Sequence, residues 1–433
     1  MIQQYLKQAW TLMKQHKLFS SIYVLGTGLS IAFSMVLFIV LYVKFAPIYP
    51  EYNRDRILVV GPSNVVGKHS NHNSTNMGIS PKAAKLFQNL PHLEKLTLSL
   101  FTSTFFNNKV TLPQQQRELL VSINYTDANF WEVFNFNFLN GKPFGAGAVE
   151  SGLAEVVLNE SMATRIFAST DVAGKYIQLD GNDVKVVGVV KDVSSVTPNT
   201  AADLYLPLGY NNMMHIDDGQ RGLMGNMRCY LMAAQKADKE LLRQEVLDAV
   251  KKYNDADKEY TTKLMGQPDD YWKSTFRDVD SSESSILSQL RSMLYILLAL
   301  LVIPTLNLCG MNSSRMSDRL AEIGVRKAYG ASNKSLLSQV LTENFVMTFM
   351  GGCLGLAFAY LIAITSDGWI LHLFDTIVFP NTVPSYFTVE MLLNPVLFLV
   401  VLCICLVLNV LSALIPALSA LRHPIIQAIQ TKR

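Results

Sequence analysis

Four long apolar segments interrupt the polar sequence of this chain and predict its layout. The first extends over residues 18–43 without a charge, and later candidates occupy 292–311, 344–366 and 391–421. A run of about 18 or more apolar residues is too long for a core strand and favours a helix that crosses a bilayer. The sequence therefore predicts an α-helical membrane protein with four transmembrane helices, whose two ends lie on the same side of the membrane.

Basic residues beside these segments predict which side that is. Lys7, Lys14 and Lys17 precede the first segment with no acidic residue among them, and the loop between the second and third segments is also rich in Lys and Arg. The loop 367–394 contains neither. Because Lys and Arg accumulate in short cytoplasmic loops, we expect cytoplasmic termini and an outward-facing segment 46–280.

The hydrophobic pattern at the start of the chain predicts two further features. Residues 1–17 have the spacing of a cytoplasmic amphipathic helix, which suits a helix lying in the headgroups, although we favour an ordinary amphipathic lead-in to the first span. The first apolar segment is longer than the core of a cleaved signal peptide, so we interpret it as a retained anchor. The full predicted organisation is helix 1–17, first span 18–45, outer domain 46–280, stalk and second span 281–311, cytoplasmic loop 312–334, third span 335–366, outer loop 367–394, fourth span 395–421 and cytoplasmic tail 422–433.

The outer domain alternates predicted strands and helices. A strand–helix–strand pattern occupies about 56–102, with Ser80 and Pro81 at the start of its helix, and the pattern recurs at about 227–265. Between them lie short β segments and turns, including a good hairpin turn at 180–182. We predict a large α+β extracytoplasmic domain of two βαβ units, with an inserted β-rich subdomain at about 149–207.

Small residues in the third apolar segment predict a close helix contact. Gly351, Gly352 and Gly355 form a patch that lets another helix approach, either in the same chain or in a second protomer. Glu343, near the cytoplasmic end of that segment, is an ionisable group at membrane depth, for which we favour a structural role over a proton relay.

Composition and motifs exclude several functions. The net charge of +3 does not indicate a nucleic-acid binder, since the basic excess lies beside the membrane. Cys229 is alone outside the apolar segments, so no disulfide is expected within the outer domain. His69 and His72 have no carboxylate nearby, and we predict no metal site there. The segment from Gly61 to Lys68 imitates a phosphate-binding loop but has the wrong spacing. No hydrolase motif is present, and we predict a non-catalytic chain.

A short helix is predicted in the cytoplasmic loop. Gly330 should end it and Ser332 should begin the next helix. From its periodicity alone, this segment fits equally a solvated connection and a helix that transmits motion from a soluble partner. One side of the helix carries Met316, Leu320, Ile323 and Lys327. The charged residues Arg319, Glu322 and Arg326 lie on its remaining surface.

Four separate stretches, in the expected order, resemble one family. The cytoplasmic "AEIGVRKAYGAS" and the closing "IPALSALRHPIIQAIQ" resemble the FtsX-like permeases of the MacB type, which include macrolide and peptide exporters and lipoprotein-releasing permeases. "NFWEVFNFNFLNGKPF" and "VVLNESMATRIFASTDVAGKYIQLDGNDVKVVGVVKDV" are similar to that family's periplasmic core domain. The resemblance covers nearly the whole chain.

The resemblance implies the permease subunit of an ATP-driven ABC exporter in the bacterial inner membrane, with its large domain in the periplasm. Such a subunit pairs with a second protomer, identical or not, binds a cytoplasmic ATPase dimer, and transmits its motion to the outer domains, which act on a substrate or a periplasmic adaptor. ATP and magnesium would be held by the partner ATPase, and no cofactor by this chain. The family's coupling helix corresponds here to Arg319, Glu322, Ile323, Gly324, Arg326, Lys327 and Gly330.

Two alternatives stay open within the same resemblance. The chain could release lipoproteins from the membrane. Its resemblance to other FtsX-like proteins also allows a role as the regulator of an envelope hydrolase. The large size of the outer domain favours the exporter.

Overall fold

The computed structural model describes the chain in two units, each of which is considered by itself. Its helical unit comprises Met1–Tyr42, Arg291–Ser366 and Thr388–Arg433, and its outer unit comprises Val43–Leu290 and Asp367–Phe387. The residues that the structure describes are 10–11, 14–15, 17–69, 73–76, 78–102, 108–112, 117–210, 221–277, 283–318, 320–365, 383 and 395–422. Most of the predicted outer loop 367–394 and of the tail 422–433 lies outside these residues.

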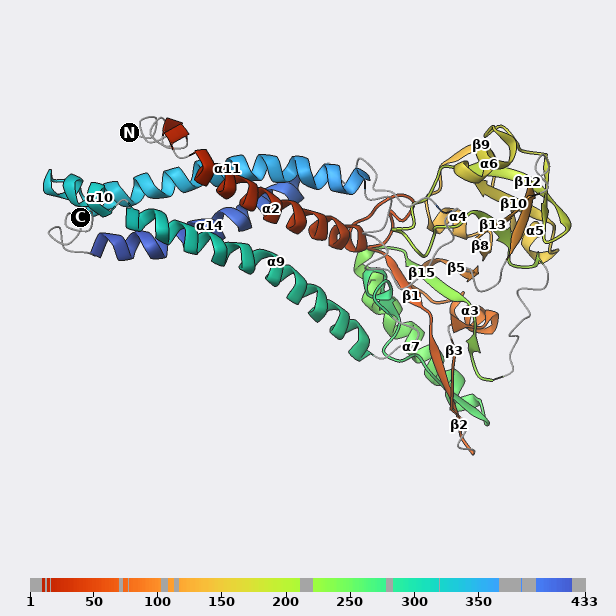
Figure 1. Cartoon of the computed structure of the whole chain (residues 1–433). Helices are drawn as coiled ribbons and strands as arrows, with labels where there is room; N and C mark the ends of the chain where they lie inside the picture. Colours follow the sequence, from red (N-terminus) through yellow and green to blue (C-terminus); the bar gives the residue numbers. More distant parts are fainter. Residues whose placement is uncertain are drawn as a thin grey trace. The chain divides into compact units, whose positions relative to one another are not determined.

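Long apolar helices dominate the helical unit (Figure 1). Three of the described helices are long and apolar enough to cross a membrane, at Ser20–Phe45, Asn333–Ile362 and Phe398–Ser419. The predicted second span falls in a continuous helix whose apolar stretch, Leu287–Ala299, is shorter, so a fourth span stays a prediction. The helices are α2 (Lys17–Phe45), α9 (Glu283–Asp318), α10 (Leu320–Ala328), α11 (Asn333–Thr365) and α14 (Pro395–Arg422).

Glycines bring α2 and α11 into backbone contact. A Cβ added to Gly355 would lie 2.6 Å from the Gly28 carbonyl oxygen, and one added to Gly351 would lie 3.1 Å from the Val24 carbonyl oxygen. At Gly352 an added Cβ would meet the Leu402 side chain of α14 at 2.6 Å. The small-residue patch predicted from the sequence is thus a packing contact within this chain.

The outer unit contains two interleaved split βαβ units. The strands β1 and β5 are connected through helix α3 and flank β15, and β15 and β17 are connected through α7 and flank β1. Neighbouring strands are antiparallel, so the order β17-β1-β15-β5 is that of a ferredoxin-like sheet. The bounds are β1 Ile57–Val60, α3 Pro81–Phe87, β5 Leu93–Thr102, β15 Arg228–Ala233, α7 Lys239–Ala256 and β17 Asp269–Asp270.

The second of the two predicted βαβ units, at about 227–265, differs from the prediction at its last strand. The segment expected to complete it forms β16, which leaves the main sheet and pairs with β2. The short strand β17 takes its place beside β1. Periodicity identified β16 as extended but carried no information on its partner. The smaller sheets contain β2 (Ser63–Gly67), β3 (Asn73–Asn76) and β16 (Tyr260–Lys263), and β4 (Gly78–Ile79) with β14 (Met224–Gly225).

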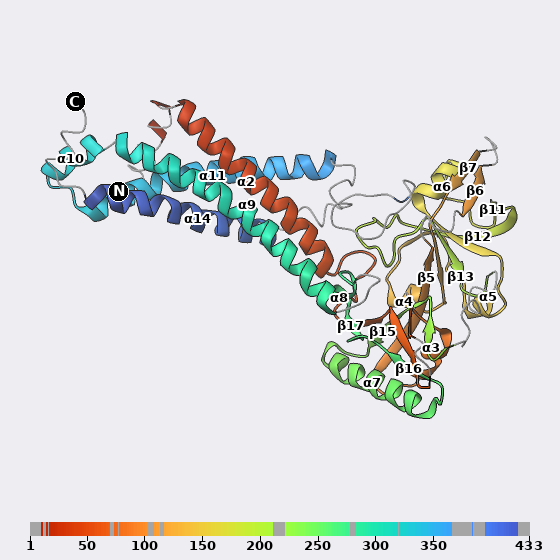
Figure 2. The ribbon, with the colours of Figure 1, turned by 60° about the horizontal axis from the view of Figure 1, so that its bottom comes forward.

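The β-rich insertion is larger than predicted and continuous with the main sheet. It lies between β5 and β15 in sequence and joins them through pairing of β8 with β5, in a sheet with twelve described strands. The boundary predicted at 149 is too late, because β9 already pairs with β12 and the hairpin β6–β7 pairs with β11 through β6. Figure 2 shows β6 and β7 beside β11. The strands are β6 Lys109–Leu112, β7 Arg117–Leu120, β8 Ile123–Thr126, β9 Phe138–Gly141, β10 Glu155–Asn159, β11 Tyr176–Leu179, β12 Asn182–Val190 and β13 Leu204–Pro207.

Turn chemistry set one register of this insertion correctly. Leu179 of β11 pairs with Asn182 of β12, which leaves Asp180 and Gly181 as a two-residue loop. Their φ angles of 48° and 83° are those of a type I′ turn, the hairpin that the sequence predicted. The remaining short helices of the outer unit are α4 (Phe130–Val133), α5 (Ala146–Glu150), α6 (Glu160–Phe167), η3 (Lys236–Asp238) and α8 (Tyr271–Ser274).

An aromatic cluster fills the core beneath α4. Trp131 lies 5.2–5.5 Å, centroid to centroid, from four other rings, those of Phe136, Phe138, Phe144 and Tyr205. The partly buried carboxylate of Asp127 joins this helix to β5: it accepts hydrogen bonds from the Thr97 hydroxyl at 2.5 Å and from the amides of Leu98 and Phe130 at 3.0 and 3.1 Å. Burial raises the pKa of Asp127 to about 6, against the lowering effect of these bonds.

A buried ion pair holds the last residues of α2, 43–45, which belong to the outer unit. The Arg54 guanidinium contacts the Glu51 carboxylate at 2.5 Å, and both side chains are less than 5% exposed. The same guanidinium donates to the carbonyl oxygens of Val43 and Ala46 at 2.5 and 2.7 Å. The Thr200 hydroxyl donates to the other Glu51 oxygen at 2.7 Å. Arg54 thus satisfies carbonyl groups that a helix end leaves without partners.

Candidate functional site

The short helix α10 lies between α9 and α11 and is fixed at its carboxyl end. Gly330 has a φ of 92°. The amide of Gly330 donates to the Lys327 carbonyl and that of Ala331 to the Arg326 carbonyl, at 2.9 and 3.0 Å. This is the Schellman pattern, which explains why glycine stands at this position. The Ser332 hydroxyl then accepts from the Ser335 amide at 3.2 Å, as expected of the residue that begins α11.

One face of α10 packs on three other helices. Ile323 is buried in a cluster with Met316 of α9, Leu336 of α11 and Ala417 of α14. Gly324 is buried as well. The predicted apolar side is therefore an internal contact, and α10 is held against the ends of the long helices.

A polar chain connects α10 to the interior of α11. The Arg326 guanidinium donates to the Gln339 side-chain oxygen at 2.5 Å, and the Gln339 amide donates to the Glu343 carboxylate at 3.3 Å. Gln339 and Glu343 are buried, at 8% and 2% exposed. Arg326, which the sequence placed on the charged outer surface, therefore bonds to α11 instead. Glu343 accepts this bond from one turn earlier in α11, and the structural role favoured for it from the sequence stays a prediction.

Two exposed side chains that were not among the predicted residues lie at the end of α10. Val325 in the helix is 45% exposed, and Tyr329, which directly follows its last residue, is 89% exposed. Lys327 is half-buried. Of the other predicted residues, Arg319 lies outside the described part of the chain, and for Glu322 only its place in the helix is described. A large aromatic ring four residues after a valine, at the end of a predicted helix, was the signal that could have identified this surface.

No group of three metal-ligating side chains occurs among the described residues. His69 is described, whereas His72 lies outside the described residues. The stretch that imitates a phosphate-binding loop forms β2, which pairs with β3 and β16. It therefore does not form the loop leading into a helix that a nucleotide site needs.

Two family models together match most of the chain. The MacB-like periplasmic core domain matches residues 20–249, and the FtsX-like permease C-terminal domain matches residues 293–425. The chain belongs to this family of ABC transporter permeases, in which a MacB-like core domain precedes an FtsX-like segment. The resemblance found in its sequence is confirmed.

Curated relatives match at low identity. The permease YknZ of Bacillus subtilis is 20% identical over 57% of this chain and 58% of its own length. The macrolide export ATP-binding/permease protein MacB of Vibrio parahaemolyticus is 22% identical over 64% of this chain and 39% of its own length. The pyoverdine export ATP-binding/permease protein PvdT of Pseudomonas savastanoi is 23% identical over 54% of this chain and 34% of its own length. The chain thus matches about a third to three fifths of the length of each.

Solved structures match the chain over about half its length. A domain of a permease protein from Porphyromonas gingivalis covers 50% of this chain, with 16% identity and a TM-score of 0.36. The extracellular domain of YknZ from Gram-positive bacteria covers 47%, with 15% identity and a TM-score of 0.31.

Proposed function

We propose that this chain is the permease subunit of an ATP-driven exporter that works by mechanotransmission, with ATP hydrolysis in a separate cytoplasmic ATPase dimer. Family membership supports the permease role. Relatives named as exporters of macrolides and of pyoverdine support export as the activity. The proposal includes four spans, a bacterial inner-membrane location, cytoplasmic termini and a periplasmic outer domain.

The division of α10 into two faces carries the proposal. Its exposed Val325 and Tyr329 offer an apolar contact to a soluble partner, while Ile323 and the Arg326–Gln339 bond hold its other face to α9, α11 and α14. The Schellman turn leads into α11 within a few residues. Because the connection between the two helices is short, a displacement of α10 would move the start of α11.

Two helices would convey this motion outward. The continuous helix α9 has 36 residues, about 54 Å at 1.5 Å per residue, against a hydrocarbon core of about 30 Å. The end of α2 is fixed in the outer unit by Arg54 and Glu51. Closure of the ATPase dimer would thus shift the outer domains of two paired protomers against a periplasmic substrate or adaptor. The substrate class would be antibiotics, peptides or similar molecules.

Loss of the exposed face should uncouple the ATPase without unfolding the chain. The tagged chain would be purified from native membranes, and the ATPase that co-elutes would be quantified. Val325→Ala/Tyr329→Ala should reduce co-eluting ATPase at least ten-fold and abolish export. Phe349→Ala, which removes an exposed ring from the apolar part of α11, is the matched control. Unchanged ATPase recovery and export in the double variant would disprove the docking assignment.

The interior contact should behave differently from the exposed one. Arg326→Ala removes the bond to Gln339 but leaves Val325 and Tyr329 in place. We expect this variant to retain the ATPase, because the docking face is intact, and to lose most of its export. Export at the wild-type rate would show that the Arg326–Gln339 bond is not needed to pass the motion of α10 to α11.

A further inference from the structure

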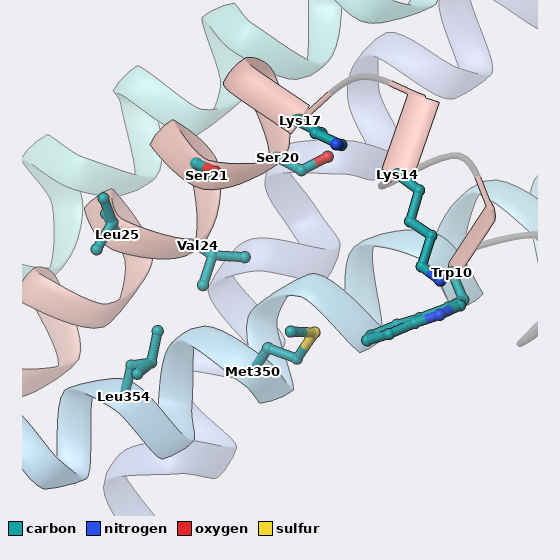
Figure 3. Close-up of a pocket in the computed structure, with 9 residues that line it drawn as sticks. All are labelled: Trp10, Lys14, Lys17, Ser20, Ser21, Val24, Leu25, Met350 and Leu354. Carbon is teal, nitrogen blue, oxygen red and sulfur yellow. The ribbon is translucent and has the colours of Figure 1, made fainter.

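A cavity of about 460 Å³ opens between the start of α2, the short helical pieces before it, and α11, all within the helical unit. Its size is within the range of small-molecule sites, about 300–1,000 Å³. Figure 3 shows Trp10, Lys14 and Lys17 at one end and Leu25 and Leu354 at the other. The described lining residues are Trp10, Lys14, Lys17, Ser20, Ser21, Val24, Leu25, Met350 and Leu354.

The two ends of this cavity differ in chemistry. At the first end two exposed lysines lie beside an aromatic ring, with the Lys14 ammonium 5.5 Å from the Trp10 ring centroid. The described lining contains no acidic residue to neutralise them. At the second end, Val24, Leu25 and Leu354 offer only hydrocarbon. A ligand that fits both ends has an anionic head and an apolar tail.

The position of the cavity along α2 selects the kind of amphiphile. The membrane-compatible part of α2 begins at Ser20, so Lys14 and Lys17 precede it and Val24 and Leu25 lie one turn inside. A bilayer changes from headgroups to acyl chains over the same interval, and Trp and Lys are typical of that boundary. The lysines are thus at phosphate depth and the leucines at acyl depth.

We propose that this cavity binds one anionic phospholipid of the cytoplasmic leaflet, with its phosphate at Lys14 and Lys17 and an acyl chain along Leu25 and Leu354. The assignment rests on the orientation in the proposed function but not on the ATPase or the substrate. The cytoplasmic leaflet is the source of such lipids, and a basic residue near it contributes about 1 kcal/mol, or roughly five-fold in affinity. The two lysines together should contribute roughly 30-fold.

The site also adjoins the contact that joins α2 to α11. Gly351 lies directly against Val24 and Thr27, and Met350 next to it lines the cavity. A bound acyl chain would therefore pack beside the glycine contact and fill the space at its edge. Lipid occupancy should favour the arrangement of α2 and α11 seen here.

The test uses the full chain in detergent, titrated with phosphatidylglycerol or with phosphatidylcholine of the same acyl chains, with bound lipids counted by native mass spectrometry. Wild-type protein should retain one phosphatidylglycerol in preference to phosphatidylcholine. Lys14→Gln/Lys17→Gln should weaken that binding about 30-fold, whereas Lys334→Gln, an exposed lysine at the start of α11, should leave it unchanged. Equal retention of the two lipids, or equal loss in the Lys334→Gln control, would overturn the proposal.

A second measurement reads the acyl end independently of charge. Phosphatidylglycerol with brominated acyl chains should quench a tryptophan introduced at the apolar end of the cavity by Leu25→Trp, whose signal is obtained by subtracting that of the chain without this substitution. Ser21→Phe, which places a ring in the cavity, should abolish this quenching while thermal unfolding of the outer unit stays unchanged. Quenching that persists in Ser21→Phe would overturn the assignment of the acyl chain to this cavity. An export defect alone, with lipid binding intact, would bear on the proposed function and not on this site.

Discussion

Replacing Arg54 by Met should strongly destabilise the outer unit. In the wild type its guanidinium pairs with Glu51, which is fully buried, and donates to the carbonyls of Val43 and Ala46. In Arg54→Met the Glu51 carboxylate would remain in the interior without its cation. Removing one partner of a buried pair costs about 3–5 kcal/mol.

This cost converts to a change in melting temperature. A domain of about 150–250 residues loses about 2–4 °C for each kcal/mol, so Arg54→Met should melt about 6–20 °C lower than the wild type. Glu51→Gln/Arg54→Met should recover part of this loss, because no uncompensated charge is then buried. The unfolding of the full chain in detergent can be followed by the fluorescence of Trp131, which reports on the core of the outer unit.

An exposed ion pair in the same unit provides the control. Lys109 contacts Glu118 at 2.6 Å on the hairpin β6–β7, and both side chains are about half exposed. Lys109→Met should leave the melting temperature unchanged, because water screens such pairs. If Arg54→Met also melted within 2 °C of the wild type, or if the double variant were less stable than Arg54→Met, the buried pair would not anchor α2 as argued.

Two further predictions concern helix packing and pH. Gly355→Ala should lower the melting temperature of the helical unit by the equivalent of about 1–3 kcal/mol, because its Cβ would lie 2.6 Å from the Gly28 carbonyl oxygen. Gly26 has open space around it, so Gly26→Ala should leave the melting temperature unchanged. Equal effects of the two substitutions would refute the close contact. Burial raises the folded-state pKa of Asp127 to about 6, above the 3.8 of an ordinary aspartate. Between these values the folded state binds more protons than the unfolded state, so stability falls as pH rises. Denaturant titrations should show wild type losing about 2 kcal/mol relative to Asp127→Asn between pH 4 and pH 6, and parallel curves would contradict the raised pKa.

Local sequence signals predicted the individual elements well. The long uncharged run of α2, the Ser-Pro start of α3 and the Asp180-Gly181 turn each depend on neighbouring residues, and each lies where expected. Pairing between distant strands does not depend on local signals. The extent of the β-rich insertion could therefore not be predicted from the sequence. It became visible only in the structure, where β8 pairs with β5 and β9 pairs with β12.

The candidate site shows the same limit. Gly330 and Ser332 set the ends of α10 and α11 through local backbone geometry, and the sequence identified both. Which side of α10 is exposed depends on the position of α11 and α14, so Arg326 was placed outside and Tyr329 was overlooked. A charged residue is usually solvated, and here Gln339 provides the partner that makes a half-buried position favourable.

If α10 is the docking site of a separate ATPase, a photoreactive group at position 329 should crosslink to that ATPase. A photoreactive phenylalanine analogue would replace Tyr329 in the full chain, and irradiation in native membranes would be followed by mass spectrometry of the products. We expect a crosslinked product that contains an ABC-type ATPase subunit, and we expect this product to be absent when the analogue replaces Phe349 instead. Products that contain only non-ATPase envelope proteins, or no ATPase product at all, would show that α10 does not dock an ATPase.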